Sequence, residues 1–256
     1  MSALSQLDLR GAELVDLLDA VSSFDWAARF AAQFVMAGGI ADGDRAKFQQ
    51  ALRYRSKSRT PFFNGLFVLS VTNFELFIKE LVDETINRKA SKAKRFSSLD
   101  QKFQDNYISK VGSVIAGKSS GTVGGMPFAR FDEVVTSFST SYLGKAPLGL
   151  IGEVFTIVMG NPTWERLEKL LETVGVTDPL GKELASTTAM KSHFKNAKWG
   201  EIVENAKTFH EGTIRRRNAI VHNIIPLSLV EEDVRDAVAF FNAFASGLAE
   251  VVRVHI

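Results

Sequence analysis

The stretch from residue 61 to residue 90, PFFNGLFVLSVTNFELFIKELVDETINRKA, constrains the fold more than any other part of the chain. Its apolar side chains recur at intervals of three and four residues, which is the period of an α-helix. The apolar stripe is wide, so other elements must cover this helix on most sides. We therefore predict a long central helix. The side chains expected on its buried face are Phe67, Ser70, Val71, Phe74, Ile78, Leu81 and Val82.

Helical spacing dominates the rest of the chain as well, and stretches with the two-residue alternation of strands are few. Near the N-terminus, Leu14, Leu17 and Leu18 share one helix face, and Ser23 or Asp25 is placed to begin a second helix. Further segments with helical spacing are 44–59, 164–176, 208–222 and 231–253. We predict an all-α fold, a helical bundle with an N-terminal helical extension.

The extension is assigned to residues 1–60, and residues 61–256 are expected to form the main helical domain. Within that domain, composition changes near 88–125, where a basic stretch (RKASKAKRF) and a Gly/Ser-rich stretch (AGKSSGTVGG) flank a possible helix. Such composition favours a flexible insertion. Farther on, Thr163 is placed to cap the helix that follows Asn161-Pro162, and Gly175 is placed to end it.

The composition excludes several kinds of site. The chain has no Cys, so disulfides, thiolate zinc sites and cysteine nucleophiles are ruled out. Its four His show no metal-ligand spacing, so we expect no metal and no cofactor. No apolar run of about 18 residues and no signal-peptide pattern is present, so we expect a cytoplasmic protein without membrane contact. The net charge of +2 is too small to indicate nucleic acid by itself.

The string RRRNAIVHN, residues 215–223, is the most informative chemical feature of the sequence. An imidazole such as that of His222 titrates near neutral pH, so it can accept a proton from a ribose 2′-OH or donate one to a leaving 5′-oxygen. A guanidinium such as that of Arg217 offers a planar, permanently charged fork to a phosphate. The ribose supplies the nucleophile in such a reaction, so the string suits metal-independent phosphodiester cleavage.

Helix geometry restricts how these residues cooperate. On a continuous helix, Arg217 and His222 are about 140° apart around the axis and about 7.5 Å apart along it. Asn218 and His222 share a face, so we expect Asn218 to orient the imidazole while Arg217 reaches in with its long side chain. A compact site then requires a break in the helix near the motif, or a second subunit across a two-fold axis.

The Asn is what makes the string specific. In a chain of this composition, an Arg five residues before a His arises by chance about 0.2 times, and requiring Asn after the Arg lowers this to roughly 0.01. In its R-N-x-x-x-H form the string resembles the signature of the HEPN superfamily. The long apolar helix with an acidic residue (SVTNFELFIKELV), the NPTWERLEKLLETVG segment and the closing VEEDVRDAVAFFNAFASGLAEVV helix are similar to the RiboL-PSP-HEPN branch and its relatives in prokaryotic conflict systems.

This resemblance, over about residues 62–256, implies an all-α HEPN fold, a homodimer and a composite ribonuclease site at the dimer interface. Arg217, Asn218 and His222 match the motif positions, and Glu75 on the earlier helix is similar to an acidic residue that supports such sites. The resemblance also implies an RNA substrate and an antitoxin or other regulatory partner. HEPN toxins silenced by nucleotidylation carry a Tyr two residues after the His, and here that position is Ile224.

The residues around the motif have alternative interpretations. Lys79, Arg215 and Arg216 are placed to bind RNA phosphates, but such charges also form solvated helix faces or salt bridges. His210, like His193, is interpreted as structural rather than catalytic. The whole surface could instead serve a non-catalytic module that binds RNA or protein, or a helical scaffold without a nucleic-acid role.

Overall fold

The computed structural model describes residues 2–36, 59–117, 122–123, 126–127, 130–144, 148–157, 160–222 and 227–255, with backbone alone at 24–36 and at the two strands. Two sequence predictions lie outside this part of the chain: nearly all of the helix at 44–59, and position Ile224. The helical elements are α1 (Ala3–Met36), α3 (Thr60–Lys92), the 3₁₀ turn η1 (Phe96–Ser98), α4 (Gln101–Ala116), α5 (Phe131–Tyr142), α6 (Glu153–Thr156), α7 (Trp164–Thr173), α8 (Lys182–Ser186), α9 (Thr188–His193), α10 (Trp199–Val221) and α11 (Glu231–His255).

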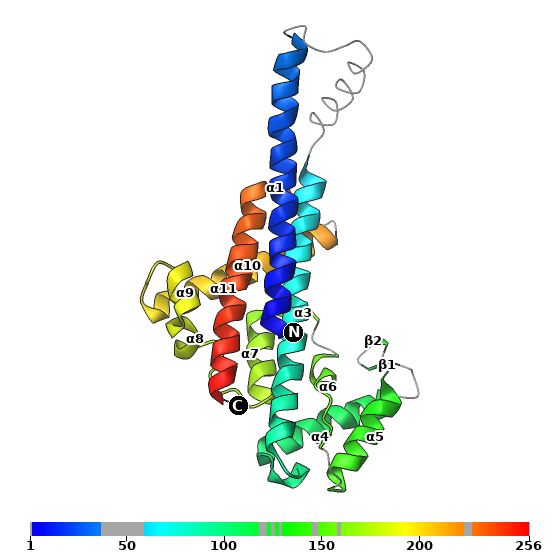
Figure 1. Cartoon of the computed structure of the whole chain (residues 1–256). Coiled ribbons are helices and arrows are strands. Elements are labelled where there is room, and N and C mark those ends of the chain that lie inside the picture. The colour runs from blue at the N-terminus through cyan, green and yellow to red at the C-terminus, as the bar shows by residue number, and fades with distance from the viewer. Residues whose placement is uncertain are drawn as a thin grey trace.

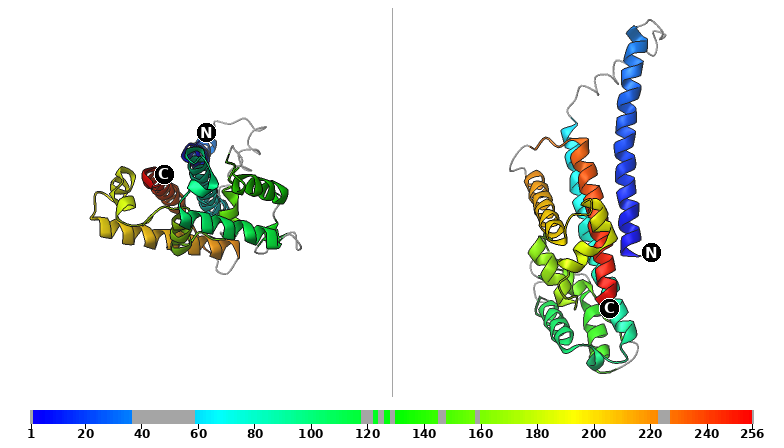
Figure 2. Two further views of the ribbon diagram at one scale, coloured as in Figure 1. Left: turned by 90° about the horizontal axis from the view of Figure 1, so that it is seen from below. Right: turned by 90° about the vertical axis from the view of Figure 1, so that its left-hand side faces the viewer.

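The prediction of an all-α bundle is confirmed. Among the described residues the only strands are β1 (Thr122–Val123) and β2 (Met126–Pro127), which pair antiparallel with each other. The long helices α1, α3 and α11 lie side by side (Figure 1), and α10 crosses α3 and α11 on the side away from α1 (Figure 2). The C-terminal half of α10, which carries the R-N-x-x-x-H motif, is therefore placed against the central helix.

The central helix α3 matches the sequence prediction closely. It begins at Thr60 with Pro61 in its first turn, where a missing N–H costs nothing, and it runs to Lys92. All seven side chains predicted on its buried face are buried. Phe74 stacks on Phe241 and Phe244 of α11, with ring centroids 4.6 and 5.4 Å apart. These aromatic contacts form the centre of the core.

The N-terminal segment is one continuous helix, so the prediction of a second helix starting at Ser23 or Asp25 is wrong. A polar side chain is tolerated on the exposed face of a helix, so a capping residue alone does not end one. Leu14 and Leu18 are buried against the bundle as expected, whereas Leu17 is 47% exposed. The first half of α1 therefore contributes buried side chains to the hydrophobic core.

Helices occupy most of residues 88–117. The basic stretch at 88–92 forms the last turns of α3, and residues 101–116 form α4. Asp100 caps α4 by accepting a hydrogen bond from the Phe103 N–H, and Phe103 and Tyr107 are buried. The possible helix predicted within this stretch is therefore present as α4, and the flexible insertion stays a prediction. The Gly/Ser-rich residues 118–121 and 124–125 lie outside the described part of the chain.

The closing helix α11 is, among the described helices, the one that is long and apolar enough to cross a membrane by length and composition. Of its most apolar 18-residue window, 61% is buried inside the bundle. Its apolar residues contact α3, α9 and α1. This burial accounts for the apolar composition of α11 as that of a core helix.

Candidate functional site

The three consecutive arginines of α10 point in different directions, because successive residues on a helix are about 100° apart. Arg215 is exposed to solvent. The Nη1 of Arg216 lies 3.0 Å from Asp233 Oδ1 of α11, and its guanidinium carbon lies 5.3 Å from the centre of the Phe67 ring. Arg216 therefore has a structural explanation, and its expected role in RNA binding loses support.

Arg217 faces the central helix and lies at the centre of a polar cluster. Its Nη1 donates hydrogen bonds to Asn161 Oδ1 at 3.0 Å and to Asn218 Oδ1 at 3.2 Å. Its Nη2 lies 3.8 Å from Glu75 Oε1 of α3, which is close enough for an ion pair but too far for a hydrogen bond. The Nε is buried and has no hydrogen-bond partner among the described residues. The side chain is 19% exposed, so the guanidinium is held at the edge of the core.

Glu75 is the only carboxylate in this cluster, within the part of the chain that the structure describes. Its side chain is 17% exposed. Burial raises the pKa of Glu75 above its ordinary value, while the positive charges of Arg217 and Lys79 act in the opposite direction. The structure thus brings Glu75 to Arg217, as the sequence resemblance implied. Lys79, one turn farther along α3, is exposed and near enough to affect the same carboxyl group.

Asn218 contacts a different partner from the one that the sequence suggested. Its side-chain oxygen accepts the hydrogen bond from Arg217, and no hydrogen bond joins it to the His222 ring. A charged guanidinium is a strong hydrogen-bond donor, so it is a favourable partner for this oxygen. No contact with the ring supports the prediction that Asn218 orients His222; in the structure Asn218 holds Arg217.

His222 stands at the point where α10 ends. Val221 is the last helical residue, and His222 occupies the C-cap with φ −91° and ψ 3°. Its backbone N–H donates to the Asn218 carbonyl at 3.0 Å, which closes the last turn. Its side chain is exposed and forms no hydrogen bond to any described residue. The predicted break in the helix thus falls at the His itself, and leaves its ring open to solvent.

Two residues that sequence reasoning did not place at the site contribute to it. Asn161, in the loop before α7, makes the shortest polar contact of the Arg217 guanidinium. Glu211 of α10 accepts a hydrogen bond from the Trp164 N–H at 2.7 Å, so it anchors the start of α7. Thr163 occupies the N-cap position as predicted, but its side chain makes no capping bond. The Asn161-Pro162 pair predicted the start of a helix. No local sequence pattern indicated that the Asn161 side chain would contact Arg217.

His210 lies on α10 about two turns before Arg217, but it belongs to the core. It is 0% exposed, and neither ring nitrogen has a hydrogen-bond partner among the residues that the structure describes. Its ring packs edge-on against Phe74 and Trp164 at 5.9 Å. Burial lowers the pKa of His210 to about 4. The interpretation of His210 as a structural residue fits this placement.

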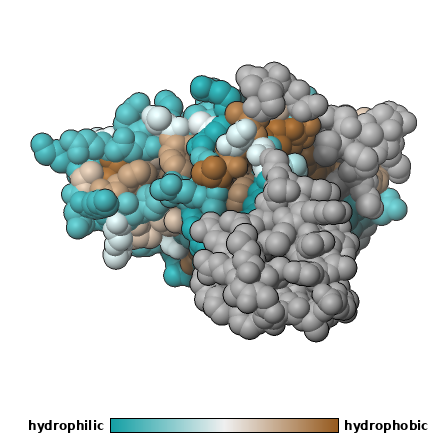
Figure 3. Space-filling view, turned by 90° about the horizontal axis from the view of Figure 1, so that it is seen from above, coloured by the Kyte–Doolittle hydropathy of each residue, from teal (hydrophilic) through white to brown (hydrophobic). Residues whose placement is uncertain are grey.

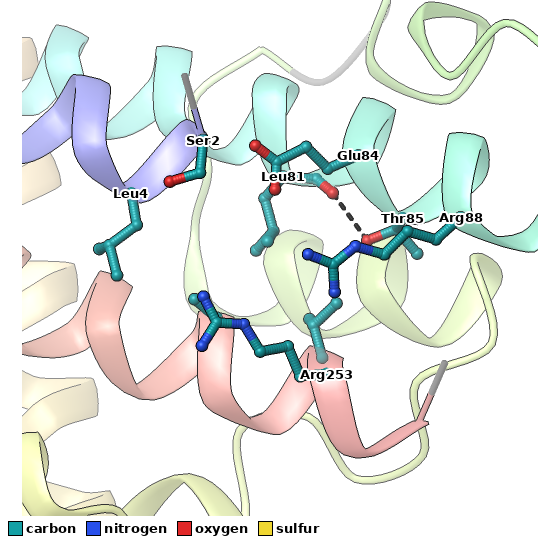
Figure 4. Close-up of a pocket in the computed structure, with 9 residues that line it drawn as sticks. Ser2, Leu4, Leu81, Glu84, Thr85, Arg88 and Arg253 are labelled. Carbon is teal, nitrogen blue, oxygen red and sulfur yellow. Dashed lines mark hydrogen bonds between the residues drawn. The ribbon is translucent and has the colours of Figure 1, made fainter.

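A small pocket lies elsewhere, where the start of α1 meets α3 and α11 (Figure 4). Arg88 and Arg253 line it, and Glu84 in its wall accepts a hydrogen bond from the Ala3 backbone N–H. Its volume of about 20 Å³ has room for roughly one water molecule. The pocket is therefore too small for a nucleotide and is separate from the Arg217 cluster.

No group of three or more His, Asp and Glu side chains among the described residues is arranged to hold a metal ion. Comparison of the chain with protein-family models, with curated proteins and with solved structures gives no match in any of the three. The family resemblance read from the motif stays a prediction.

Proposed function

We propose that this protein is a HEPN-type endoribonuclease that cleaves RNA without a metal ion. The observation that carries the proposal is the Arg217 guanidinium, which Glu75, Asn161 and Asn218 hold in place on the helix that ends, five residues later, at the exposed imidazole of His222. In the proposed reaction the ribose 2′-oxygen attacks the adjacent phosphorus and the bond to the 5′-oxygen breaks. The products are a 2′,3′-cyclic phosphate and a 5′-OH, and no water is consumed.

Each residue has a defined role in this scheme. His222 takes the proton of the 2′-OH or delivers a proton to the leaving 5′-oxygen, and its exposed ring is free to approach RNA. Arg217 stabilises the charge that develops on the phosphate oxygens. Asn218 and Glu75 hold the guanidinium from two sides. Lys79 and Arg215, both exposed, attract the RNA backbone.

The proposal includes a homodimer, because one copy of Arg217 and His222 on the same helix makes a poor compact pair. Phe62, Leu69 and Leu76 recur every seven residues along α3 and are 36%, 48% and 39% exposed. They form an exposed apolar stripe along α3. Figure 3 shows, without identifying single residues, that apolar and hydrophilic surface alternate on the face seen from above. Such a stripe, next to Glu75, supports pairing with a second copy.

The proposed context follows from the resemblance to conflict-system proteins. A metal-free ribonuclease of this kind would act in the cytoplasm as a toxin or anti-phage effector, without a cofactor. An antitoxin or other regulatory partner would keep it inactive until needed. Expression of the wild-type chain should then slow growth, and His222→Ala should relieve that effect.

The experiment is RNA cleavage in the presence of EDTA by the wild type, His222→Ala and Arg217→Ala. We expect activity in the wild type and a loss of about 10²- to 10⁴-fold in each variant. Arg216→Ala is the matched control, since it removes a neighbouring guanidinium that pairs with Asp233 instead. Full activity in both site variants would reject the proposed site, and loss of wild-type activity on chelation would reject the metal-free reaction.

A non-catalytic RNA-binding module is the second candidate. The observation that favours it is the 19% exposure of Arg217, whose guanidinium already has three partners within the chain. That module would bind several classes of RNA in a salt-dependent way and cleave none of them. Cleavage with a cyclic-phosphate product decides between the two candidates.

A further inference from the structure

The loop that begins at Gly160 is attached to α10 at two points. At one end, Asn161 Oδ1 accepts the hydrogen bond from Arg217 Nη1 at 3.0 Å. At the other, the Trp164 N–H donates to Glu211 Oε1 at 2.7 Å. Glu211 and Arg217 are six residues apart on α10, so the two attachments are about 9 Å apart along the helix axis. The loop therefore lies along the helix segment that leads into the motif.

The backbone around Asn161 is held in one conformation. Gly160 has φ +55°, a left-handed conformation that residues with a Cβ rarely adopt. The Asn161 carbonyl accepts the Thr163 N–H at 2.9 Å and a longer bond from Arg166 Nη1 at 3.5 Å. The ring of Pro162 fixes its own φ. The side-chain oxygen of Asn161 is thus presented to α10 from a turn whose backbone geometry these contacts restrict.

Asn161 is the contact that fixes Arg217 from outside its own helix. The bond to Asn218 comes from the next residue of the same helix and is longer, at 3.2 Å. Glu75 attracts the guanidinium at 3.8 Å but does not direct a hydrogen bond to it. Removing Asn161 would leave Nη1 with one weaker partner, and a flexible side chain could then leave its position. Misplacement of a catalytic group by about 1 Å costs about 10²-fold in rate.

We propose that Asn161 is a positioning residue of the ribonuclease site, which sets the orientation of Arg217 toward the scissile phosphate. This inference rests on the proposed function. Asn161 acts through Arg217 and not on the RNA, so its removal changes the chemical step more than substrate binding. The loop before α7 then acts together with α10 at the site. Asn161, although it lies far from the motif in sequence, affects the rate of the cleavage step.

The test compares Asn161→Ala with Asn161→Asp, which keeps an oxygen acceptor of the same shape. We expect Asn161→Ala to lower kcat about 10- to 100-fold with KM changed less than about 3-fold. Asn161→Asp should recover most of kcat. The matched control is Asn106→Ala, because Asn106 donates its amide to the Thr173 carbonyl at the opposite end of α7. If Asn106→Ala loses as much thermal stability as Asn161→Ala but keeps full kcat, loss of support for α7 does not explain the lower kcat of Asn161→Ala. The lower kcat then reflects the positioning of Arg217.

A double-mutant cycle completes the test. If Asn161 acts through Arg217, adding Asn161→Ala to Arg217→Ala should lower residual cleavage by less than about 3-fold. Independent, multiplicative losses in an active enzyme would overturn the positioning role while leaving the ribonuclease intact. A kcat loss in Asn161→Ala that Asn161→Asp does not recover would overturn it too. Absence of cleavage by the wild type would instead reject the proposed function, and the positioning role with it.

Discussion

His210 should make the folded chain sensitive to mild acid. Its imidazole is fully buried among aromatic rings, and neither ring nitrogen has a hydrogen-bond partner in the described part of the chain. Desolvation alone lowers its pKa, from 6.5 to about 4. The folded state therefore holds this ring neutral, whereas the unfolded chain protonates it as soon as the pH falls below about 6.5.

The sign and size of the effect follow from proton linkage. The unfolded state binds more protons between pH 6.5 and pH 4, so the free energy of unfolding falls as the pH is lowered through this range. At pH 5 the expected loss is about 2 kcal/mol, and it reaches about 3 kcal/mol below pH 4. This loss is a large fraction of the free energy of unfolding of a domain of ordinary stability.

Urea unfolding of the wild type and His210→Leu at pH 7 and pH 5 would measure this contribution. Leu has a similar volume and does not titrate, so stability at pH 7 should change by less than about 1.5 kcal/mol. The difference between the free energies of unfolding at pH 7 and pH 5 should be smaller by about 2 kcal/mol in the variant than in the wild type. His193→Leu is the control, because its half-buried ring has a pKa that burial lowers and nearby Asp236 raises. An unchanged pH dependence in His210→Leu would refute the reasoning.

Three further predictions concern packing and charge. Gly247→Ala should lower the free energy of unfolding by about 1 kcal/mol despite better helix propensity, because its Cβ would lie 2.8 Å from Leu184 Cδ1 in the core; a stabilised variant would contradict this. Tyr107→Phe removes the acceptor of the buried Ile151 N–H at 2.9 Å and should cost about 1–3 kcal/mol in urea unfolding, with no change expected only if water replaces the hydroxyl. Arg216→Ala should cost about 0.5–1 kcal/mol and leave RNA cleavage within about 3-fold of wild type; a 100-fold loss would return this residue to the site.

The central helix shows how much of the fold follows from the sequence alone. Apolar spacing over 61–90 predicted both the helix and the seven side chains that it buries. This works because helical period and burial are properties of one segment, and any fold has to satisfy them. The same reasoning located α7 and its stop at Gly175, where φ is +92°.

The N-terminal helix shows where local signals fail. Ser23 and Asp25 are good capping residues, yet α1 continues to Met36. The described contacts with α11 lie just before these two residues, since Ser22 donates to Glu231 of α11 and Arg235 of α11 pairs with Asp19. A capping preference of about 1 kcal/mol is therefore too small by itself to end this helix.

The candidate site divides in the same way. The sequence located the motif on a helix and predicted that Arg217 and His222 would diverge there, because both statements depend on spacing alone. Only the tertiary structure decided that Asn161, 56 residues earlier, would hold Arg217, and that Asn218 would serve the Arg instead of the His. Those contacts depend on where α10 crosses α3 and on the loop before α7. No short-range pattern encodes that crossing, because it is set by packing across the whole core.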